Sequence, residues 1–310
     1  RSRPLSFRFD GRSYSGFAGD TLASALVAND VKLVGRSFKY HRPRGILTAG
    51  SEEPNALVTL RTGAYAEPNT RATTIQLFDG LEAVSQNRWP SLAWDLLAVN
   101  QLASPLFVAG FYYKTFFGPA KLWLVYEWFI RRAAGLGNAP QEADPDRYSQ
   151  RAAFCDVLVV GGGPAGLQAA VDAADAGKRV ILVEQDAELG GCLLRDPHDL
   201  GPDWIGSAED RIRAAGGTIL LRTTASGYWE HDLVTLVQRI TEPGQVPTDG
   251  TAQRLWHVRA GKVILATGCI ERPIAFAHND RPGVMLSQAV RTYVRRFGVL
   301  PGKRVVIATN

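Results

Sequence analysis

The sequence predicts two fold classes in one chain, an α+β unit followed by an α/β unit with a parallel sheet. Residues 1–88 contain short alternating strands, turn signals and one helical segment, which is typical of a small α+β unit. From residue 151 onward, short apolar runs alternate with helical segments, as in a parallel sheet with crossover helices. With 310 residues, 45% of them hydrophobic, the chain is long enough to bury two separate cores.

The first strands are predicted around a tight turn. Leu5–Phe9 and Arg12–Tyr14 alternate apolar and polar residues on either side of Asp10 and Gly11, which is a hairpin signal. Asp20 is a suitable N-cap for a helix that would run from Thr21 to about Ala28. We therefore expect a hairpin followed by one short helix.

The order of hairpin, helix, glycine-containing loop and strand resembles the β-grasp fold of plant-type [2Fe–2S] ferredoxin domains. In those domains the loop after the helix carries the pattern C-x4-C-x2-C. Counted back from a predicted strand at Ala56–Arg61, the equivalent positions are Thr48, Glu53 and Ala56, none of which supplies a thiolate. The prediction for residues 1–88 is thus a β-grasp, ferredoxin-like unit without an iron–sulfur cluster.

Residues 89–150 are predicted to form an apolar helical connector and linker. Leu96–Tyr113 contains no charged residue over 18 positions, which reaches the lower length of a membrane-spanning helix. Polar residues, a proline and a glycine interrupt this stretch, so the sequence does not favour a membrane span. We interpret it as a helical arm packed against other parts of a complex, with core packing inside the chain as the alternative. Residues 135–145 then serve as a linker.

The α/β unit opens on a glycine turn. The apolar run Val157–Val160 predicts a buried strand, and the glycines after it keep the spacing G-x-G-x-x-G. Gly161 allows the tight turn, Gly163 allows the backbone to approach a pyrophosphate, and Gly166 allows helix and strand to pack closely. A purely structural turn is the alternative, since this pattern alone is weak evidence.

The residues around that turn also favour a dinucleotide. The helix opens at Pro164 and Ala165, where unpaired N–H groups and a partial positive charge suit phosphates. A second apolar run, Val180–Glu184, ends in a carboxylate that can accept hydrogen bonds from ribose hydroxyls. Because Glu184 would repel a 2′-phosphate, NAD or FAD fits better than NADP.

Two later motifs extend the Rossmann-like pattern. Gly190 and Gly191 follow Glu184 by six and seven residues, and Val263–Gly268 reads as a strand ending in Ala-Thr-Gly. Residues 154–310 resemble flavoprotein reductases and oxidases with two dinucleotide domains, of which the second would be truncated here. The predicted dinucleotide-binding residues are Gly161, Gly163, Pro164, Ala165, Gly166, Glu184, Gln185, Gly190, Gly191, Ala225, Thr267 and Gly268.

Composition excludes several classes of function. A net charge of only +5 does not suit a nucleic-acid-binding protein. The three cysteines, Cys155, Cys192 and Cys269, are widely spaced, which excludes a disulfide framework or a cysteine-based metal site and favours a cytoplasmic location. Cys192 is interpreted as a small packing residue. We predict no catalytic residue and no metal ligand, and the abrupt ends indicate a fragment.

Five motifs together resemble the α subunit of heterotetrameric sarcosine oxidase. The resemblance implies a complex that demethylates sarcosine to glycine with O2 and tetrahydrofolate, giving H2O2 and 5,10-methylenetetrahydrofolate. It implies FAD on a flavin-bearing β subunit, FMN between the α and β subunits, NAD bound by α, further small subunits, and a folate-binding domain beyond residue 310. The motifs are Tyr40–Gly45, Ala49–Val58, Ala109–Phe116, Ile130–Gly137 and Asn279–Met285.

Other interpretations stay open. His41 is more consistent with a phosphate contact or a solvated basic loop than with a catalytic acid. The adjacent Glu52 and Glu53 would point apart in an extended loop and would not form a catalytic pair. Alternative functions are an NAD(P)H-dependent FAD reductase, the α subunit of a related amine or imino-acid dehydrogenase such as a hydrogen cyanide synthase-like complex, and a scaffold whose bound NAD never turns over.

Overall fold

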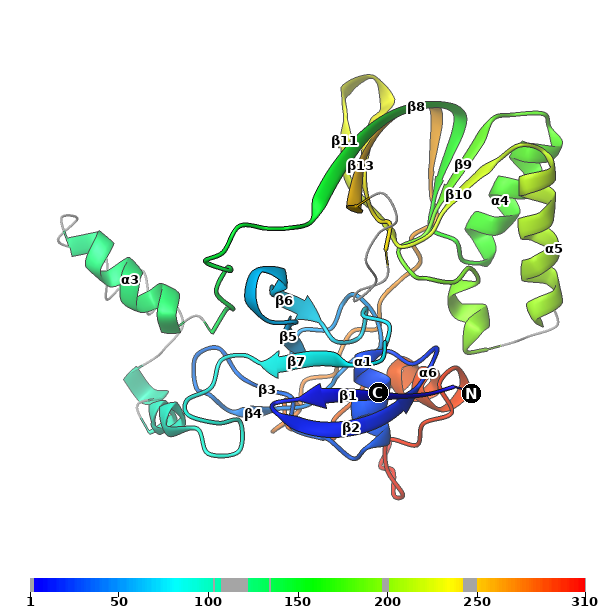
Figure 1. Ribbon diagram of the computed structural model, residues 1–310. Coiled ribbons are helices and arrows are strands. Elements are labelled where there is room, and N and C mark those ends of the chain that lie inside the picture. The colour runs from blue at the N-terminus through cyan, green and yellow to red at the C-terminus, as the bar shows by residue number, and fades with distance from the viewer. Residues whose placement is uncertain are drawn as a thin grey trace. The chain divides into compact units, whose positions relative to one another are not determined.

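We describe the chain from a computed structural model. The structure describes residues 3–102, 104–106, 122–133, 135–196, 201–241 and 250–309. The chain forms two compact units, one made of Arg1–Asp144 together with Glu271–Asn310 and the other of Pro145–Ile270 (Figure 1).

The first unit is built on a mixed five-stranded sheet with the order β2-β1-β7-β5-β6. β1 and β2 form the predicted antiparallel hairpin, in which Asp10 and Gly11 have φ of 48° and 78°, and β7 pairs in parallel with β1. The sheet strands are β1 (Pro4–Phe9), β2 (Arg12–Phe17), β5 (Leu57–Leu60), β6 (Glu67–Arg71) and β7 (Leu81–Ser85); β3 (Gly35–Arg36) and β4 (Pro43–Arg44) form a separate two-stranded sheet, and η1 is Gly63–Tyr65.

Helix α1 (Leu22–Ala28) covers the core of this sheet, close to the predicted range. Its N-cap is Thr21, not the predicted Asp20. The Thr21 Oγ1 accepts a hydrogen bond from the Ser24 N–H at 3.1 Å, and the Ser24 Oγ accepts one from the Thr21 N–H at 2.9 Å. This reciprocal pair is a capping box. Asp20 supports it from outside, since its Oδ1 accepts from the Ser24 hydroxyl at 3.0 Å.

The C-terminal residues 271–310 pack with the first unit. The predicted second domain, residues 151–310, therefore extends further along the chain than the second unit of the structure, Pro145–Ile270. Helix α6 (Ser287–Arg295) contributes Ala289 and Tyr293 to the same core as β1 and α1. The physical reason is burial, because Tyr293 is fully buried there. Val305–Thr309, within the region expected to belong to the truncated second dinucleotide domain, has no strand pairing, and Val306 is 95% exposed.

The connector contains short helices: η2 (Leu96–Gln101), η3 (Ser104–Leu106) and α3 (Trp123–Ala133). The rest of the predicted apolar stretch, from residue 107 to Tyr113, and the motif Ala109–Phe116 lie outside the described residues. In the part of the chain that the structure describes, no helix is long and apolar enough to cross a membrane. Exposed apolar side chains mark the connector, with Trp94 80% and Leu102 82% exposed.

The second unit is an α/β layer with a six-stranded sheet of order β10-β9-β8-β13-β12-β11. β8, β9, β10 and the whole of β13 run in parallel, whereas β11, β12 and β13 form an antiparallel meander. Helices α4 and α5 lie side by side next to β9 and β10 (Figure 1). The elements are β8 (Arg147–Val160), α4 (Pro164–Asp175), β9 (Val180–Val183), η5 (Gly191–Leu194), α5 (Gly201–Ala214), β10 (Thr218–Leu220), β11 (Thr223–Trp229), η6 (Glu230–Asp232), β12 (Leu233–Arg239) and β13 (Thr251–Leu265).

Both faces of β9 and of the end of β8, Val157–Val160, are buried, which explains their continuous apolar sequences. All four residues of β9 are buried. On one face of the sheet Leu167 from α4 and Ile212 from α5 pack against Val159 and Leu182. This packing fixes the end of β8, the turn that follows it and the start of α4, which are the elements that carry the predicted site.

Candidate dinucleotide site

The glycine turn between β8 and α4 has no room for larger residues. Gly161 has φ of 110°, a left-handed conformation that favours glycine. A Cβ atom at Gly166 would collide with the backbone carbonyl oxygen of Gly161. The glycine turn after β8 can therefore lie against the start of helix α4 only because residues 161 and 166 are both glycine. These are the packing roles predicted for Gly161 and Gly166.

The N-terminus of α4 is open. Gly163 is its N-cap and supplies no side chain, and Pro164 occupies the first turn. The Gly163 carbonyl accepts from the Leu167 N–H at 2.8 Å, so the helix begins here. A Cβ atom built at Gly163 would meet no heavy atom within 4 Å. Unpaired N–H groups at such an end attract anions, so the first turn that contains the half-buried Pro164 and the exposed Ala165 suits a phosphate.

Glu184 lies directly after β9 and is buried, with 9% of its surface exposed. Its Oε2 accepts a hydrogen bond from the Gly162 N–H at 2.6 Å, and its Oε1 accepts one from the Asp186 N–H at 2.8 Å. A carboxylate has about four acceptor positions, so two of them remain for further donors such as ribose hydroxyls. The acid is thus oriented beside the glycine turn, as predicted.

Gly162 is the residue that sequence reasoning missed. It is the middle glycine of Gly-Gly-Gly and does not belong to the G-x-G-x-x-G pattern. A Cβ atom there would lie 2.6 Å from Leu189 Cδ2 and 3.0 Å from Glu184 Oε2. The signal that could have revealed it is the extra glycine itself, which lets the backbone N–H reach the carboxylate.

The second glycine pair lies against the first. The Gly190 N–H donates to the Gly162 carbonyl oxygen at 2.8 Å. A Cβ atom at Gly191 would lie 3.0 Å from the Gly163 Cα. The structure therefore brings together the two motifs that the sequence connected only by spacing. Cys192, interpreted from sequence as a packing residue, is instead exposed.

The Ala-Thr-Gly segment also reaches the turn. The Ala266 N–H donates to the Val160 carbonyl oxygen at 2.8 Å, and a Cβ atom at Gly161 would collide with the Ala266 carbonyl oxygen. Thr267 and Gly268 follow directly and are exposed, with φ of 70° at Gly268. The predicted neighbourhood of glycine turn, Glu184, second glycine pair and Ala-Thr-Gly is thus assembled from four separate parts of the unit.

Two predicted residues are less closely tied to this neighbourhood. Gln185 is exposed next to Glu184. Ala225 lies in β11, and its side chain packs against the core cluster that contains Leu236. The nearer contact from β11 is Thr223, whose N–H donates to the Glu184 carbonyl oxygen at 2.8 Å. A role of Gln185 or Ala225 in binding stays a prediction.

His41, in the first unit, differs most from its prediction. It is buried rather than in a solvated basic loop, and its Nδ1 lies 2.7 Å from Asp95 Oδ2. The Arg36 Nε lies 3.9 Å from the same Asp95 oxygen. The sequence could not place this carboxylate beside His41, because Asp95 is 54 residues away in the chain.

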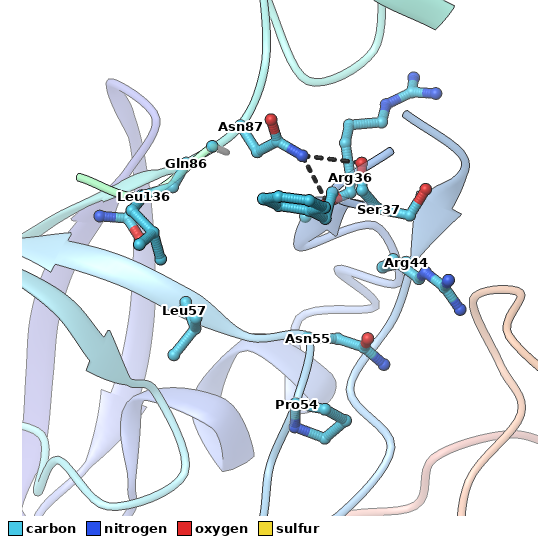
Figure 2. A pocket seen from close by; sticks show the side chains of 12 residues that line it. Arg36, Ser37, Arg44, Pro54, Asn55, Leu57, Gln86, Asn87 and Leu136 are labelled. Carbon is cyan, nitrogen blue, oxygen red and sulfur yellow. Dashed lines mark hydrogen bonds between the residues drawn. The ribbon is translucent and has the colours of Figure 1, made fainter. Parts of the chain in front are cut away.

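A cavity of about 290 Å³ lies beside this loop in the first unit (Figure 2). Asn87 forms one wall, and its Nδ2 donates to the carbonyl oxygens of Arg36 and Ser37 at 3.1 and 2.7 Å. Arg44 also lines the cavity, and desolvation by burial lowers its pKa although Asp280 opposes this. Its Nη1 lies 3.0 Å from Asp280 Oδ2. The polar groups of this cavity are thus largely engaged within the chain.

Two family models match parts of the chain. Residues 156–259 match the family described as "FAD dependent oxidoreductase", and residues 2–88 match "2Fe-2S iron-sulfur cluster binding domain". The second match confirms the ferredoxin-like resemblance. These matches correct the predicted cofactors. The second unit matches an FAD family, whereas NAD was predicted for it. The first unit matches a family of cluster-binding domains, whereas no iron–sulfur cluster was predicted.

The residues of the first unit lack the usual ligands of such a cluster. Cysteine thiolates are its usual ligands, and none of Cys155, Cys192 and Cys269 lies within residues 2–88. Glu53, at one of the three equivalent positions, is buried and hydrogen-bonded inside the loop. Among the described residues, no group of three or more His, Cys, Asp or Glu could hold a metal ion. The side chains present do not fit a thiolate-held cluster.

Curated relatives match the whole chain. The sarcosine oxidase alpha subunit of Rhizobium meliloti (strain 1021) is 54% identical over 317 residues, covering 100% of this chain and 32% of the relative. The protein of the same name from Corynebacterium sp. (strain U-96) is 36% identical, covering 100% of this chain and 28% of the relative. The chain thus spans about a third of the length of these relatives.

A solved structure supports the fold. L-proline dehydrogenase from P. horikoshii matches 98% of this chain and 48% of its own with a TM-score of 0.61 at 20% identity. At that identity the likeness concerns the fold alone. Over its whole length the chain is homologous to about a third of the sarcosine oxidase alpha subunits, and part of its second unit matches an oxidoreductase family.

Proposed function

We propose that the second unit binds the adenosine diphosphate part of FAD. The observation that carries the proposal is the Glu184 carboxylate, held by the Gly162 N–H at 2.6 Å beside the uncapped N-terminus of α4. Diphosphate would lie at the open side of Gly163, where the helix offers N–H groups and a partial positive charge. The ribose hydroxyls would donate to the two remaining acceptor positions of Glu184.

The chemistry that we propose is oxidation of an amine by the whole protein. FAD supplies a two-electron acceptor when it is bound, and the residues of this chain bind and orient it. Following the relatives, the substrate would be sarcosine. Sarcosine, O2 and tetrahydrofolate would give glycine, H2O2 and 5,10-methylenetetrahydrofolate, a balance in which O2 takes the two electrons and tetrahydrofolate takes the one-carbon unit.

We propose that the chain works within a hetero-oligomer that contains a flavin-bearing β subunit together with further small subunits. The exposed apolar residues of the connector support this, because Trp94, Leu96 and Leu102 are 80%, 61% and 82% exposed. Such side chains are common in interfaces between subunits. The catalytic residues would then lie outside this chain.

The direct test is flavin occupancy after Glu184→Ala. The protein is purified, and bound FAD is measured by its visible flavin absorbance and by release on denaturation. Loss of charge-assisted ribose bonds should cost about 1–3 kcal/mol, or a roughly five- to 150-fold weaker affinity for FAD. Asp172→Ala is the matched control, because it removes an exposed carboxylate from the same unit. Equal occupancy in both variants would remove Glu184 from the site.

A related amine or imino-acid oxidoreductase is the second candidate. An opine oxidase subunit of Rhizobium meliloti is 31% identical over 50% of this chain, and the hydrogen cyanide synthase subunit HcnB of Pseudomonas protegens is 32% identical over 49%. The test is turnover of sarcosine, opines, proline and glycine by the intact complex with an artificial electron acceptor. Turnover of sarcosine alone supports the first proposal, whereas preference for another of these amines supports the second.

A further inference from the structure

The loop of residues 47–56 in the first unit is folded around a buried carboxylate. Glu53 is 1% exposed, and both of its oxygens accept hydrogen bonds. Oε2 accepts from the N–H groups of Leu47 and Thr48 at 3.0 and 2.7 Å and from the Thr48 hydroxyl at 3.0 Å. Oε1 accepts from the N–H groups of Asn55 and Ala56 at 2.8 and 3.2 Å. Five donors thus converge on one anionic group.

The negative charge of Glu53 is balanced by the loop itself. Among the ion pairs of the described residues none involves Glu53; the contact with Arg71 is made by the Glu53 backbone carbonyl oxygen, at 3.3 Å from Nε. The buried charge is therefore compensated by backbone N–H groups, the arrangement by which loops bind anions. Without an anion, the four N–H groups would be left buried and unpaired.

We infer that this loop is an anion-binding site that the chain occupies with its own Glu53 side chain. A small carboxylate such as formate fits the same donors, because it presents the same two oxygens as Glu53. The site lies where the loop meets the rest of the first unit. The Thr48 carbonyl accepts from the Tyr293 hydroxyl at 2.9 Å, and Asn55 lines the cavity beside it (Figure 2).

Because these contacts are shared, the anion also holds the neighbouring segment in place. The Leu47 carbonyl accepts from the Leu286 N–H at 2.9 Å, immediately before helix α6. The Glu53 side chain orders Leu47 and Thr48 through their N–H groups. The carbonyls of the same two residues accept hydrogen bonds from the Leu286 N–H and the Tyr293 hydroxyl. Loss of the anion is expected to loosen both the loop and the start of α6.

The test is chemical rescue of Glu53→Ala in the intact protein. The variant should melt at a lower temperature than the wild type, and added sodium formate should raise its melting temperature in a saturable way, relative to sodium chloride of equal ionic strength. Glu52→Ala is the control, because Glu52 is the adjacent acid but is exposed. A formate effect equal in Glu53→Ala, Glu52→Ala and wild type would overturn the inference.

A second variant keeps the test decisive if Glu53→Ala does not fold. Glu53→Gln conserves shape but removes the charge and turns a donor toward the loop N–H groups. Peptides covering residues 44–57 and 284–296 should exchange amide hydrogens about ten- to a hundredfold faster than in wild type, as loss of charge-assisted bonds requires. Unchanged protection of the first peptide would show that the loop does not need the anion.

Discussion

Asp95 is expected to be a main support of the first unit, and its replacement by alanine gives the largest effect that we predict. The Asp95 side chain is fully buried and lies 2.7 Å from His41 Nδ1. Its Oδ1 accepts from the N–H groups of Trp89 and Leu97 at 3.1 and 3.2 Å, and the Arg36 Nε lies 3.9 Å from Oδ2. Asp95→Ala would therefore leave a buried imidazole and a guanidinium without their carboxylate.

The magnitude follows from these contacts. Removing one partner of a buried charge pair costs about 3–5 kcal/mol, because the other charge stays buried and uncompensated. We expect the free energy of unfolding to fall by about that amount. The measurement is urea unfolding followed by tryptophan fluorescence. The control is Asp30→Ala, whose carboxylate is exposed and pairs with Lys32 on the surface, with an expected change within about 0.5 kcal/mol.

A double-mutant cycle with His41→Ala separates the pair from its surroundings. If Asp95 and His41 act on each other, the combined loss should be smaller than the sum of the single losses by about 1 kcal/mol or more. Additive losses, or an Asp95→Ala effect below about 1 kcal/mol, would refute the argument that this buried pair supports the loop.

Three further predictions concern the second unit. Gly166→Ala should destabilise the unit by about 1–3 kcal/mol and lower flavin occupancy, since its Cβ would strike the glycine turn, as thermal melting and absorbance would show. Burial raises the pKa of the Cys155 thiol to about 11. Iodoacetamide at mildly alkaline pH should therefore label the exposed Cys192 and Cys269 rapidly, and Cys155 only after unfolding. Prompt labelling of all three cysteines would contradict this prediction. Hydrogen bonds from Arg179 lower the pKa of Asp156 to about 2. The stabilisation by ionised Asp156 should therefore be complete above the unfolded-state pKa of about 3.9 and should vanish as the pH falls to about 2. Comparing Asp156→Asn with wild type across that range tests the sign, and a difference confined to lower pH would contradict it.

The α/β site could be predicted because its information is local. Gly161 and Gly166 fit their positions for steric reasons that any sequence with this spacing shares, and Glu184 directly follows the next strand of the same sheet. Parallel strands place such ends at one edge. What spacing could not reveal is the Gly162 N–H that orients the carboxylate, because backbone donors carry no residue signature.

The first unit was predicted only in outline, because several of its contacts join residues far apart in the sequence. Its hairpin and helix depend on local turn and cap residues, and these were found in place. The pairing of His41 with Asp95 is a long-range contact, and so is the hydrogen bond that the Tyr293 hydroxyl donates to the Thr48 carbonyl across 245 residues. No periodicity or motif encodes which distant segment closes a core, so these contacts appear only in the structure.

Two buried glutamates differ in how many hydrogen bonds they accept from their own chain. Glu53 accepts five hydrogen bonds from its own loop, which saturates the roughly four acceptor positions of a carboxylate. Glu184 accepts two from backbone N–H groups and keeps acceptor capacity beside an uncapped helix end. From sequence, Glu184 was predicted by its place after a strand, whereas Glu53 was only judged unsuitable as half of a catalytic pair. A ligand can therefore compete for a role at Glu184 without breaking the fold, whereas at Glu53 it can enter only after the side chain has been removed.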